Sequence, residues 1–316
     1  MLVTMYVSAL VRSAALGLIV TLAVGCVSSA PENIPQVRGE FGRRPTVTVP
    51  DLPPPEDARM KVLSQGDGPV TREGQVVVTD VDMRLWEGNK PLMDTYRLGQ
   101  PTTAVLDGRH VARTWDQALL GRSAGSRVLM VAPASYGFGP NGMAPAQVAP
   151  GEHLIVTFDV IGGYDPRQQV AEGSPEDMGG RGTVPAVRVK PGKEPEITTW
   201  GQAPRQLRAR TLVSGKGASI AEGDTVVVQW SGWSWGNKEP FASTYRRSGP
   251  NGFLVKKQTV PPGWHEALKG RTVGSRLLLA VPKSQDPSFT TTKGGVGVPQ
   301  DADIVYVIDI LDRRAR

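Results

Sequence analysis

The sequence predicts two copies of an α+β domain, each built from an antiparallel sheet and one short helix. Residues 115–127 return as residues 264–276, an offset of 149, with eight of thirteen positions identical. A repeat of this length indicates a duplicated domain, because solenoid units span roughly 20–50 residues. Each copy contains several strand-like runs but only one short helical run, which favours an α+β plan. The 37 Gly and 27 Pro residues indicate many turns and substantial linkers.

The first copy is expected to fold over residues 59–164. Strands are predicted at residues 60–63, 75–85, 126–132 and 154–161 from their apolar runs and alternation. Residues 114–120 carry Trp115, Ala118 and Leu119 at the spacing of one helical face, with Thr114 as the expected N-cap and Gly121 as the C-cap.

The second copy, residues 205–313, repeats this order after a Gly- and Pro-rich linker at residues 165–204. Strands are predicted at residues 225–230, 276–281 and 304–311, and the helix at residues 263–268. Residues 45–50 alternate like a strand, and residues 195–199 look like their echo. The repeat is therefore expected to begin upstream of each compact unit.

The N-terminal residues indicate export. A short apolar run at residues 13–25 follows Arg12 and is shorter than the roughly 20 residues that span a bilayer, so it is typical of a signal peptide at residues 1–25. Ala23-Val24-Gly25-Cys26 resembles a bacterial lipobox, which predicts lipidation of Cys26 and anchoring on the extracytoplasmic face of the cell membrane. An uncleaved anchor helix and a start at Met5 remain alternatives. Residues 26–58 are polar and Pro-rich and are expected to form an extended spacer.

Composition argues against several other functions. The net charge of +6 comes without a dense Lys/Arg block, so nucleic-acid binding is disfavoured. Cys26 is the single cysteine, so no internal disulfide forms, and the three histidines lack the spacing of zinc ligands. Gly121-Arg122-Ser123-Ala124-Gly125 formally matches a nucleophile elbow, but it closes a helix instead of opening one, and the repeat replaces the serine with Thr272.

The motifs of both copies resemble one family. Trp86-Glu87-Gly88-Asn89-Lys90 is followed by a Val-x-x-x-Trp-x-x-Ala-Leu-x-Gly pattern, then by Gly-Ser-Arg and a closing Phe-Asp-Val. This order is similar to that of the FKBP-type peptidyl-prolyl cis-trans isomerases, over roughly two-thirds of the chain, and the whole looks like a tandem lipoprotein of the actinobacterial kind. The resemblance implies an antiparallel sheet of five or six strands wrapped around one short helix, with an aromatic-lined pocket between them.

The reaction that the resemblance implies needs neither a nucleophile nor a cofactor. Rotation about an amide costs roughly 18–20 kcal/mol because of resonance. X-Pro bonds isomerise over tens to hundreds of seconds and can limit folding. A pocket that removes water from the amide and holds the proline ring favours the twisted transition state over the planar one.

The resemblance assigns pocket residues in both copies. In the first copy these are the floor Trp115, the wall Tyr136 with a hydroxyl that bonds a substrate carbonyl, and Val111, Leu92, Val148 and Phe158. In the second copy they are Trp264, Phe241, Trp230, Phe253, Val260 and Val298. Trp233 and Trp235 alternate out of phase with Trp230, so at least one of them is expected to pack the sheet instead.

Both copies depart from the family pattern. The first-strand tyrosine falls on Val81, and the pocket aspartate falls on Met93 in the first copy and on Ala242 in the second. The family's isoleucine after the pocket valine falls on Ala112 in the first copy and on Pro261 in the second. The arginine that partners the aspartate falls on Leu98 in the first copy, whereas the second copy has Arg247 there. The wall tyrosine of the second copy falls on Gln285. Losing a preorganised electrostatic group worth about 2–3 kcal/mol lowers a rate by about 10²–10³.

Two functions from different classes follow. The first is a weak prolyl isomerase that assists folding of exported proteins and takes X-Pro polypeptides as clients. The alternative is a non-catalytic, chaperone-like pair of FKBP-like modules that bind a peptide or protein. The missing aspartates favour the second function, and the intact helix motif with Tyr136 favours the first. No cofactor, metal or nucleic acid is expected in either case.

Overall fold

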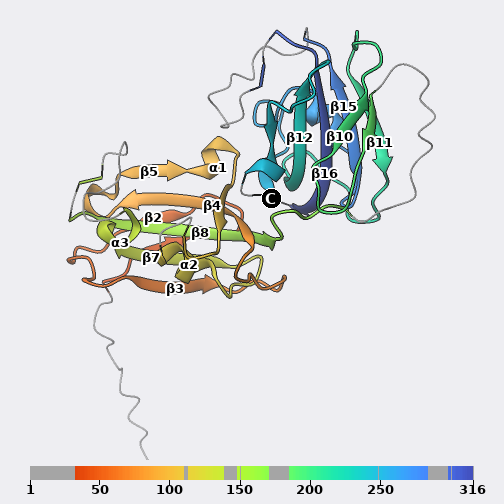
Figure 1. Cartoon of the computed structure of the whole chain (residues 1–316). Helices are drawn as coiled ribbons and strands as arrows, with labels where there is room; N and C mark the ends of the chain where they lie inside the picture. Colours follow the sequence, from red (N-terminus) through yellow and green to blue (C-terminus); the bar gives the residue numbers. More distant parts are fainter. Residues whose placement is uncertain are drawn as a thin grey trace, which may run out of the picture. The chain divides into compact units, whose positions relative to one another are not determined.

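The computed structural model describes residues 33–109, 113–138, 148–149, 151–170, 185–247, 249–283, 298–299 and 301–315. These residues form two six-stranded antiparallel sheets of the same topology, each preceded by a two-stranded hairpin (Figure 1). The predicted fold class is therefore confirmed. Cys26 and the predicted signal peptide lie outside the described residues.

The first sheet follows the order β3-β7-β8-β4-β5, with β6 also paired to β4. Its strands are β3 (Arg59–Ser64), β4 (Val76–Leu85), β5 (Pro91–Asp94), β6 (Thr102–Val105), β7 (Arg127–Pro133) and β8 (His153–Tyr164). Short helices connect them: η1 (Glu87–Asn89), α1 (Thr95–Leu98), α2 (Arg113–Leu119) and α3 (Ala134–Phe138).

The second sheet follows the matching order β11-β15-β16-β12-β13, with β14 paired to β12. Its strands are β11 (Arg208–Val213), β12 (Thr225–Ser234), β13 (Ala242–Ser243), β14 (Asn251–Leu254), β15 (Arg276–Val281) and β16 (Ile304–Arg314). The short helices are η2 (Thr244–Arg246) and α4 (Trp264–Leu268). Every strand predicted from alternation is present, because each strand has one face in the inner core beneath the helix.

The caps of the first helix agree with the sequence at one end. Gly121 has a φ of +71°, the left-handed conformation that suits glycine after a helix. Thr114 instead lies within α2, and its buried hydroxyl has no hydrogen-bond partner among the described residues. The prediction that Thr114 is the N-cap is therefore wrong, because the helix begins at Arg113.

A hairpin covers the outer face of each sheet, the face opposite the helix. β1 (Gln36–Arg38) and β2 (Thr46–Thr48) contribute Val37 and Val47 to an apolar cluster with Trp86, Leu129 and Ile155. β9 (Ala186–Arg188) and β10 (Glu196–Thr199) contribute Val187 and Ile197 to the corresponding cluster of the second sheet. The described part of residues 26–58 thus differs from an extended spacer, because the hairpin buries apolar side chains there.

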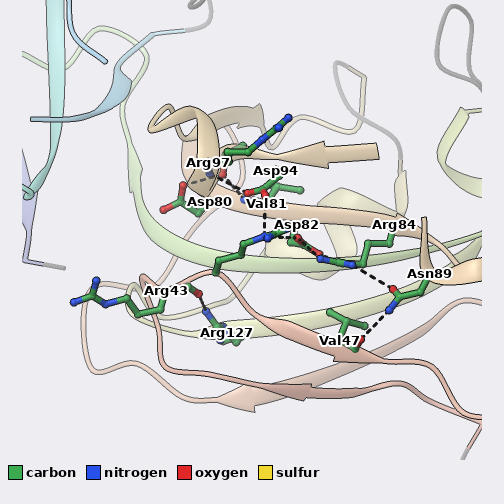
Figure 2. A network of polar contacts seen from close by, with 12 residues as sticks. Arg43, Val47, Asp80, Val81, Asp82, Arg84, Asn89, Asp94, Arg97 and Arg127 are labelled. Atoms are coloured by element: carbon green, nitrogen blue, oxygen red, sulfur yellow. Dashed lines mark hydrogen bonds and ion pairs between the residues drawn. The ribbon is translucent and has the colours of Figure 1, made fainter. Parts of the chain in front are cut away.

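A buried ion pair lies beneath each hairpin. Arg127 donates two hydrogen bonds to Asp159, at 2.7 and 2.8 Å, and the two side chains are 3% and 0% exposed. Arg127 also donates to the carbonyl of Arg43, as Figure 2 shows, and to that of Gly39. The Gly42 amide donates to Asp159, so the pair ties the hairpin to the sheet. Arg276 and Asp309 repeat the pair in the second sheet, at 2.6 and 2.7 Å.

The charges where hairpin and sheet meet are reversed between the copies. Arg44 forms an ion pair with the buried Asp94 at 2.8 Å and lies 3.9 Å from Asp82. In the second copy Glu194 stands 150 residues after Arg44. It faces no acid there, because Ser231 and Ser243 occupy the positions equivalent to Asp82 and Asp94. Glu194 accepts hydrogen bonds from Ser231 and Arg246.

Among the described residues, no helix is long and apolar enough to cross a membrane. The same part of the chain contains no cluster of three or more His, Cys, Asp or Glu side chains suited to holding a metal ion.

Candidate functional site

The floor of the first candidate pocket is Trp115 on α2. Its ring meets Phe158 of β8 edge to face, with centroids 4.9 Å apart and planes at 79°. Trp115 is 9% exposed and Phe158 is fully buried, so the pair joins the helix to the inner face of the sheet. Edge-to-face pairs of this kind stabilise packing by about 0.5–1.5 kcal/mol beyond area burial.

The other described walls of this pocket are aliphatic. Val81, Leu92, Met93 and Val148 all pack in or against the same cluster as Trp115. Ala104 of β6 pairs with Val77 of β4. In the second copy the equivalent pair is Phe253 of β14 with Val226 of β12. The first pocket thus has a small side chain where the second has an aromatic ring.

Tyr136 lies on α3 at the end of β7 and is 48% exposed. Its ring is therefore accessible, as a wall tyrosine requires, and its bond to a substrate carbonyl stays a prediction. Val111 and Ala112 lie outside the described residues, as does Gln285 of the second copy.

A neighbouring acid does not replace the missing aspartate of the first copy. Met93 packs against the inner core, whereas Asp94 follows it on the strand and points to the opposite face. Asp94 caps α1 by accepting from the Arg97 amide (Figure 2). It also forms the ion pair with Arg44. Its carboxylate therefore belongs to the contact between hairpin and sheet.

The second candidate pocket is built around Trp264 on α4. Three rings lie edge-on to it: Phe253 at 5.2 Å, Trp230 at 5.4 Å and Tyr306 at 5.4 Å. Gly263 precedes Trp264 with a φ of +78°, and a Cβ there would lie 2.7 Å from Leu207, so glycine is required to bring the helix this close. Trp264 is fully buried.

The remaining predicted residues of the second pocket converge on the same cluster. Val260 and Val298 are 1% and 4% exposed, and both are members of it, while Phe241 packs against it from the edge. Trp233 and Trp235 belong instead to the outer cluster under the hairpin, which confirms that the three alternating tryptophans serve different faces.

Tyr306 is an aromatic wall that the sequence did not reveal. It lies opposite Gly232, whereas the first copy has Val156 opposite Met83 at the same place. A Cβ on Gly232 would lie 2.7 Å from Phe241 and 3.0 Å from Tyr306, so the large ring fits because the glycine is small. A glycine within a strand was the available signal, since it often marks a close approach.

Three polar atoms of this aromatic cluster are buried without a partner among the described residues. They are Nε1 of Trp230, Nε1 of Trp264 and the hydroxyl of Tyr306. Burial raises the pKa of Tyr306 well above its ordinary value, so the hydroxyl stays neutral. The second pocket therefore contains unused donors in an otherwise apolar surrounding.

A small cavity borders this cluster. Within the second domain it is lined by Trp230, Phe253, Ala242, Ser243, Thr244, Arg247, Asn251 and Gly252. Ala242, at the aspartate position, and Arg247, at the position of its partner, thus reach the same cavity.

Comparison with known proteins agrees with this geometry. The family model described as FKBP-type peptidyl-prolyl cis-trans isomerase matches twice, at residues 68–161 and 216–311. The two matches cover more than half of the chain, and each spans most of one six-stranded sheet, from before β4 into β8 and from before β12 into β16. The chain belongs to this family and contains two of its domains.

The relatives cover one domain at a time. An FK506-binding protein of Streptomyces anulatus is 30% identical over 118 residues, which are 37% of this chain and 95% of the relative. The isomerase FkpA of Escherichia coli is 35% identical over 104 residues, 33% of this chain and 36% of FkpA. The structure of the three FKBP domains of wheat FKBP73 covers 82% of this chain and 95% of its own, at 17% identity and a TM-score of 0.30.

Proposed function

We propose that this protein is a weak prolyl cis-trans isomerase that acts on X-Pro segments of exported proteins at the cell envelope. The observation that carries the proposal is the helix tryptophan that lies beneath the inner face of both sheets, edge-on to an aromatic ring. Such a surface binds a proline ring and excludes water from the adjoining amide, which is the chemistry that isomerisation needs. Family membership supports the same reaction.

Weak turnover is proposed because neither pocket has the family's aspartate. Met93 and Ala242 occupy that position, and the nearest acid of the first copy, Asp94, faces the outer network. Without the electrostatic contribution of that group, rates are expected to lie about 10²–10³ below those of members that retain it.

The first domain is the better candidate for turnover, since it retains Tyr136, which is 48% exposed and lies on α3, a helix that contacts α2. The test is NMR exchange spectroscopy on X-Pro peptides with residues 33–316, which contain both sheets. Tyr136→Phe removes only the hydroxyl and is expected to lower the exchange rate at least fivefold. Leu120→Ala, at a side chain 44% exposed, is the matched control and is expected to leave the rate unchanged.

The second candidate function is peptide binding without turnover. It is favoured by the absence of the aspartate from both pockets and by the close packing of the aromatic rings around Trp264. Peptides that shift the Trp115 or Trp264 indole signals without enhanced exchange would select this function. If the peptides neither bind nor show enhanced exchange, both candidate functions are excluded.

Anchoring through a lipid on Cys26 is the proposed route to the envelope. The lipobox-like string and the apolar run before it support this proposal. Metabolic labelling with a clickable fatty acid is expected to mark the protein in its host, and Cys26→Ser is expected to abolish the label and release the protein from membranes. Label retained on the Cys26→Ser protein would refute the anchor.

A further inference from the structure

We propose that the first domain has a second binding site, an open groove that takes a basic segment of another protein and holds an aromatic side chain of that segment beside Trp86. The groove lies between residues 47–54, which include the end of β2, and residues 86–89, which include η1. Its volume is about 840 Å³, within the roughly 300–1,000 Å³ that ligand sites occupy. All of its lining residues belong to the first domain.

The floor of the groove is apolar and already formed. Trp86 and Val47 are 5% and 6% exposed, and Val49 packs against the same outer cluster. The side-chain amide of Asn89 donates to the Val47 carbonyl at 2.9 Å, which joins the two segments that line the groove (Figure 2). Because these contacts exist without a ligand, binding requires little further ordering of the protein.

The second copy shows which side chain such a floor accepts. Trp235 is the equivalent of Trp86, and Trp200 packs against it with ring centroids 5.8 Å apart. Trp200 stands 150 residues after Pro50, the offset at which the second hairpin follows the first. Pro50 lines the groove of the first copy and has only a small ring. An aromatic side chain of a partner therefore fits where the second copy has its own tryptophan.

The charges of the groove specify the rest of the ligand. Asp51 and Glu87 line it, one from each of the two segments, and no Lys or Arg is among the described lining residues. Both acids are exposed and so are accessible to a partner. Complementary charge adds specificity to an apolar contact, which favours Lys or Arg next to the aromatic side chain. The second copy has Gly201 and Gly236 at the two equivalent positions, so the acids accompany the open groove and not the filled one.

The groove and the candidate prolyl pocket belong to opposite faces of the first sheet. Trp86 is part of the outer cluster under the hairpin, whereas Trp115 is part of the inner cluster. A partner bound in the groove leaves the inner pocket accessible, and its binding does not depend on isomerase activity.

The test is an NMR titration of isotope-labelled residues 33–316, which contain both sheets, with unlabelled blocked peptides that contain no proline. The peptides are Lys-Gly-Trp-Gly-Lys, Glu-Gly-Trp-Gly-Glu and Lys-Gly-Ala-Gly-Lys, and the indole N–H signal of Trp86 reports binding after assignment with Trp86→Phe. The first peptide is expected to bind about fivefold more tightly than either of the others. Its advantage over the Glu peptide is expected to shrink in high salt. The Trp235 signal is expected to stay in place, since Trp200 packs against that ring.

One pair of variants tests the charges. Asp51→Asn/Glu87→Gln is expected to remove the preference for the Lys peptide over the Glu peptide while both still move the Trp86 signal. Asp67→Asn/Glu73→Gln is the matched control, because it changes the net charge equally at two exposed side chains that precede β4, whereas Trp86 follows β4. The control is expected to keep the preference.

A second pair tests the place of the aromatic side chain. Pro50→Trp supplies the ring that the second copy has and is expected to weaken binding of the Lys-Trp peptide about tenfold, because the variant fills the groove itself. Pro50→Ala is its control and is expected to bind as the natural chain does. Unaltered binding by Pro50→Trp would contradict the placement of the partner's ring beside Trp86.

Equal binding of the Lys and Glu peptides, or a preference that survives Asp51→Asn/Glu87→Gln, would overturn the assignment of a basic ligand. A Trp86 signal that no peptide moves would refute the site. A Trp86 signal that moves with protein concentration alone would show that a second copy covers the groove, which also refutes the proposal. The exchange of X-Pro peptides is a separate measurement, so each of these failures is distinguishable from failure of the proposed function.

Discussion

Removal of the buried guanidinium of Arg127 is expected to destabilise the first domain strongly. In Arg127→Met, Asp159 stays fully buried without its counter-charge, and the carbonyls of Gly39 and Arg43 lose their donor. Removing one partner of a buried pair costs about 3–5 kcal/mol. That is a large share of the roughly 5–15 kcal/mol by which domains are stable.

The double variant Arg127→Met/Asp159→Leu measures how much of this loss comes from the stranded carboxylate. Replacing both members of a buried pair by apolar side chains is often neutral for stability. Here the Gly42 amide also loses its acceptor at Asp159, so only part of the loss is expected to return. We expect the double variant to be more stable than Arg127→Met but less stable than the natural chain.

Urea unfolding of residues 33–316, followed by the indole signal of Trp115, measures the free energy of unfolding of this domain. Arg276→Met, which breaks the corresponding pair with Asp309, is the matched control and is expected to leave the Trp115 transition in place. A cost below about 1 kcal/mol for Arg127→Met, or a double variant as unstable as the sum of both single changes, would refute the reasoning.

Three further predictions concern packing, charge and pH. Gly232→Met is expected to destabilise the second domain by about 1–3 kcal/mol, because its side chain overlaps Phe241 and Tyr306; adding Tyr306→Val recreates the first copy's pairing and is expected to restore the urea midpoint read from Trp264. Arg44→Glu places a third acid beside Asp94 and is expected to cost about 1 kcal/mol and to expose the hairpin to limited proteolysis. Burial raises the pKa values of four tyrosines, Tyr96, Tyr164, Tyr245 and Tyr306. The stability that these groups contribute is complete below the unfolded pKa of about 10 and falls as pH rises toward the folded values, so their phenolate absorbance is expected to appear together with unfolding.

Each of these predictions has an outcome that contradicts it. For Gly232→Met, the contradicting outcome is a Gly232→Met/Tyr306→Val double variant that stays as unstable as the single variant. For Arg44→Glu, the contradicting outcome is a hairpin that is cleaved no faster than in the natural chain. For the tyrosines, it is complete phenolate formation while circular dichroism still reports folded sheets.

The sequence predicted the fold well, because the alternation of each strand reflects a two-sided environment. β15 begins and ends at the predicted residues, and β2 and β10 lie where the two echoing segments indicated. The hairpins' position on the outer face was not predictable from alternation, since a three-residue strand with one buried valine gives almost no periodic signal.

The candidate site was predictable where a motif fixed the residue and not where two side chains changed together. Trp115 and Trp264 follow from the repeated helix motif. Tyr306 does not, because its place depends on Gly232 of another strand, and the first copy has Met83 and Val156 at the paired positions. Thr114 was predicted as the N-cap because threonine is a preferred N-cap residue, but the helix begins one residue earlier.

The reversed charges of Arg44 and Glu194 bear on how a tandem chain avoids misassembly. Two homologous domains on one polypeptide risk exchanging equivalent segments while they fold. The second hairpin, placed on the first sheet, would set Glu194 against the buried acids Asp82 and Asp94, whereas the first hairpin on the second sheet would bring Arg44 toward Arg246. Both exchanges would bring like charges together, so these charges favour the contact of each hairpin with its own sheet.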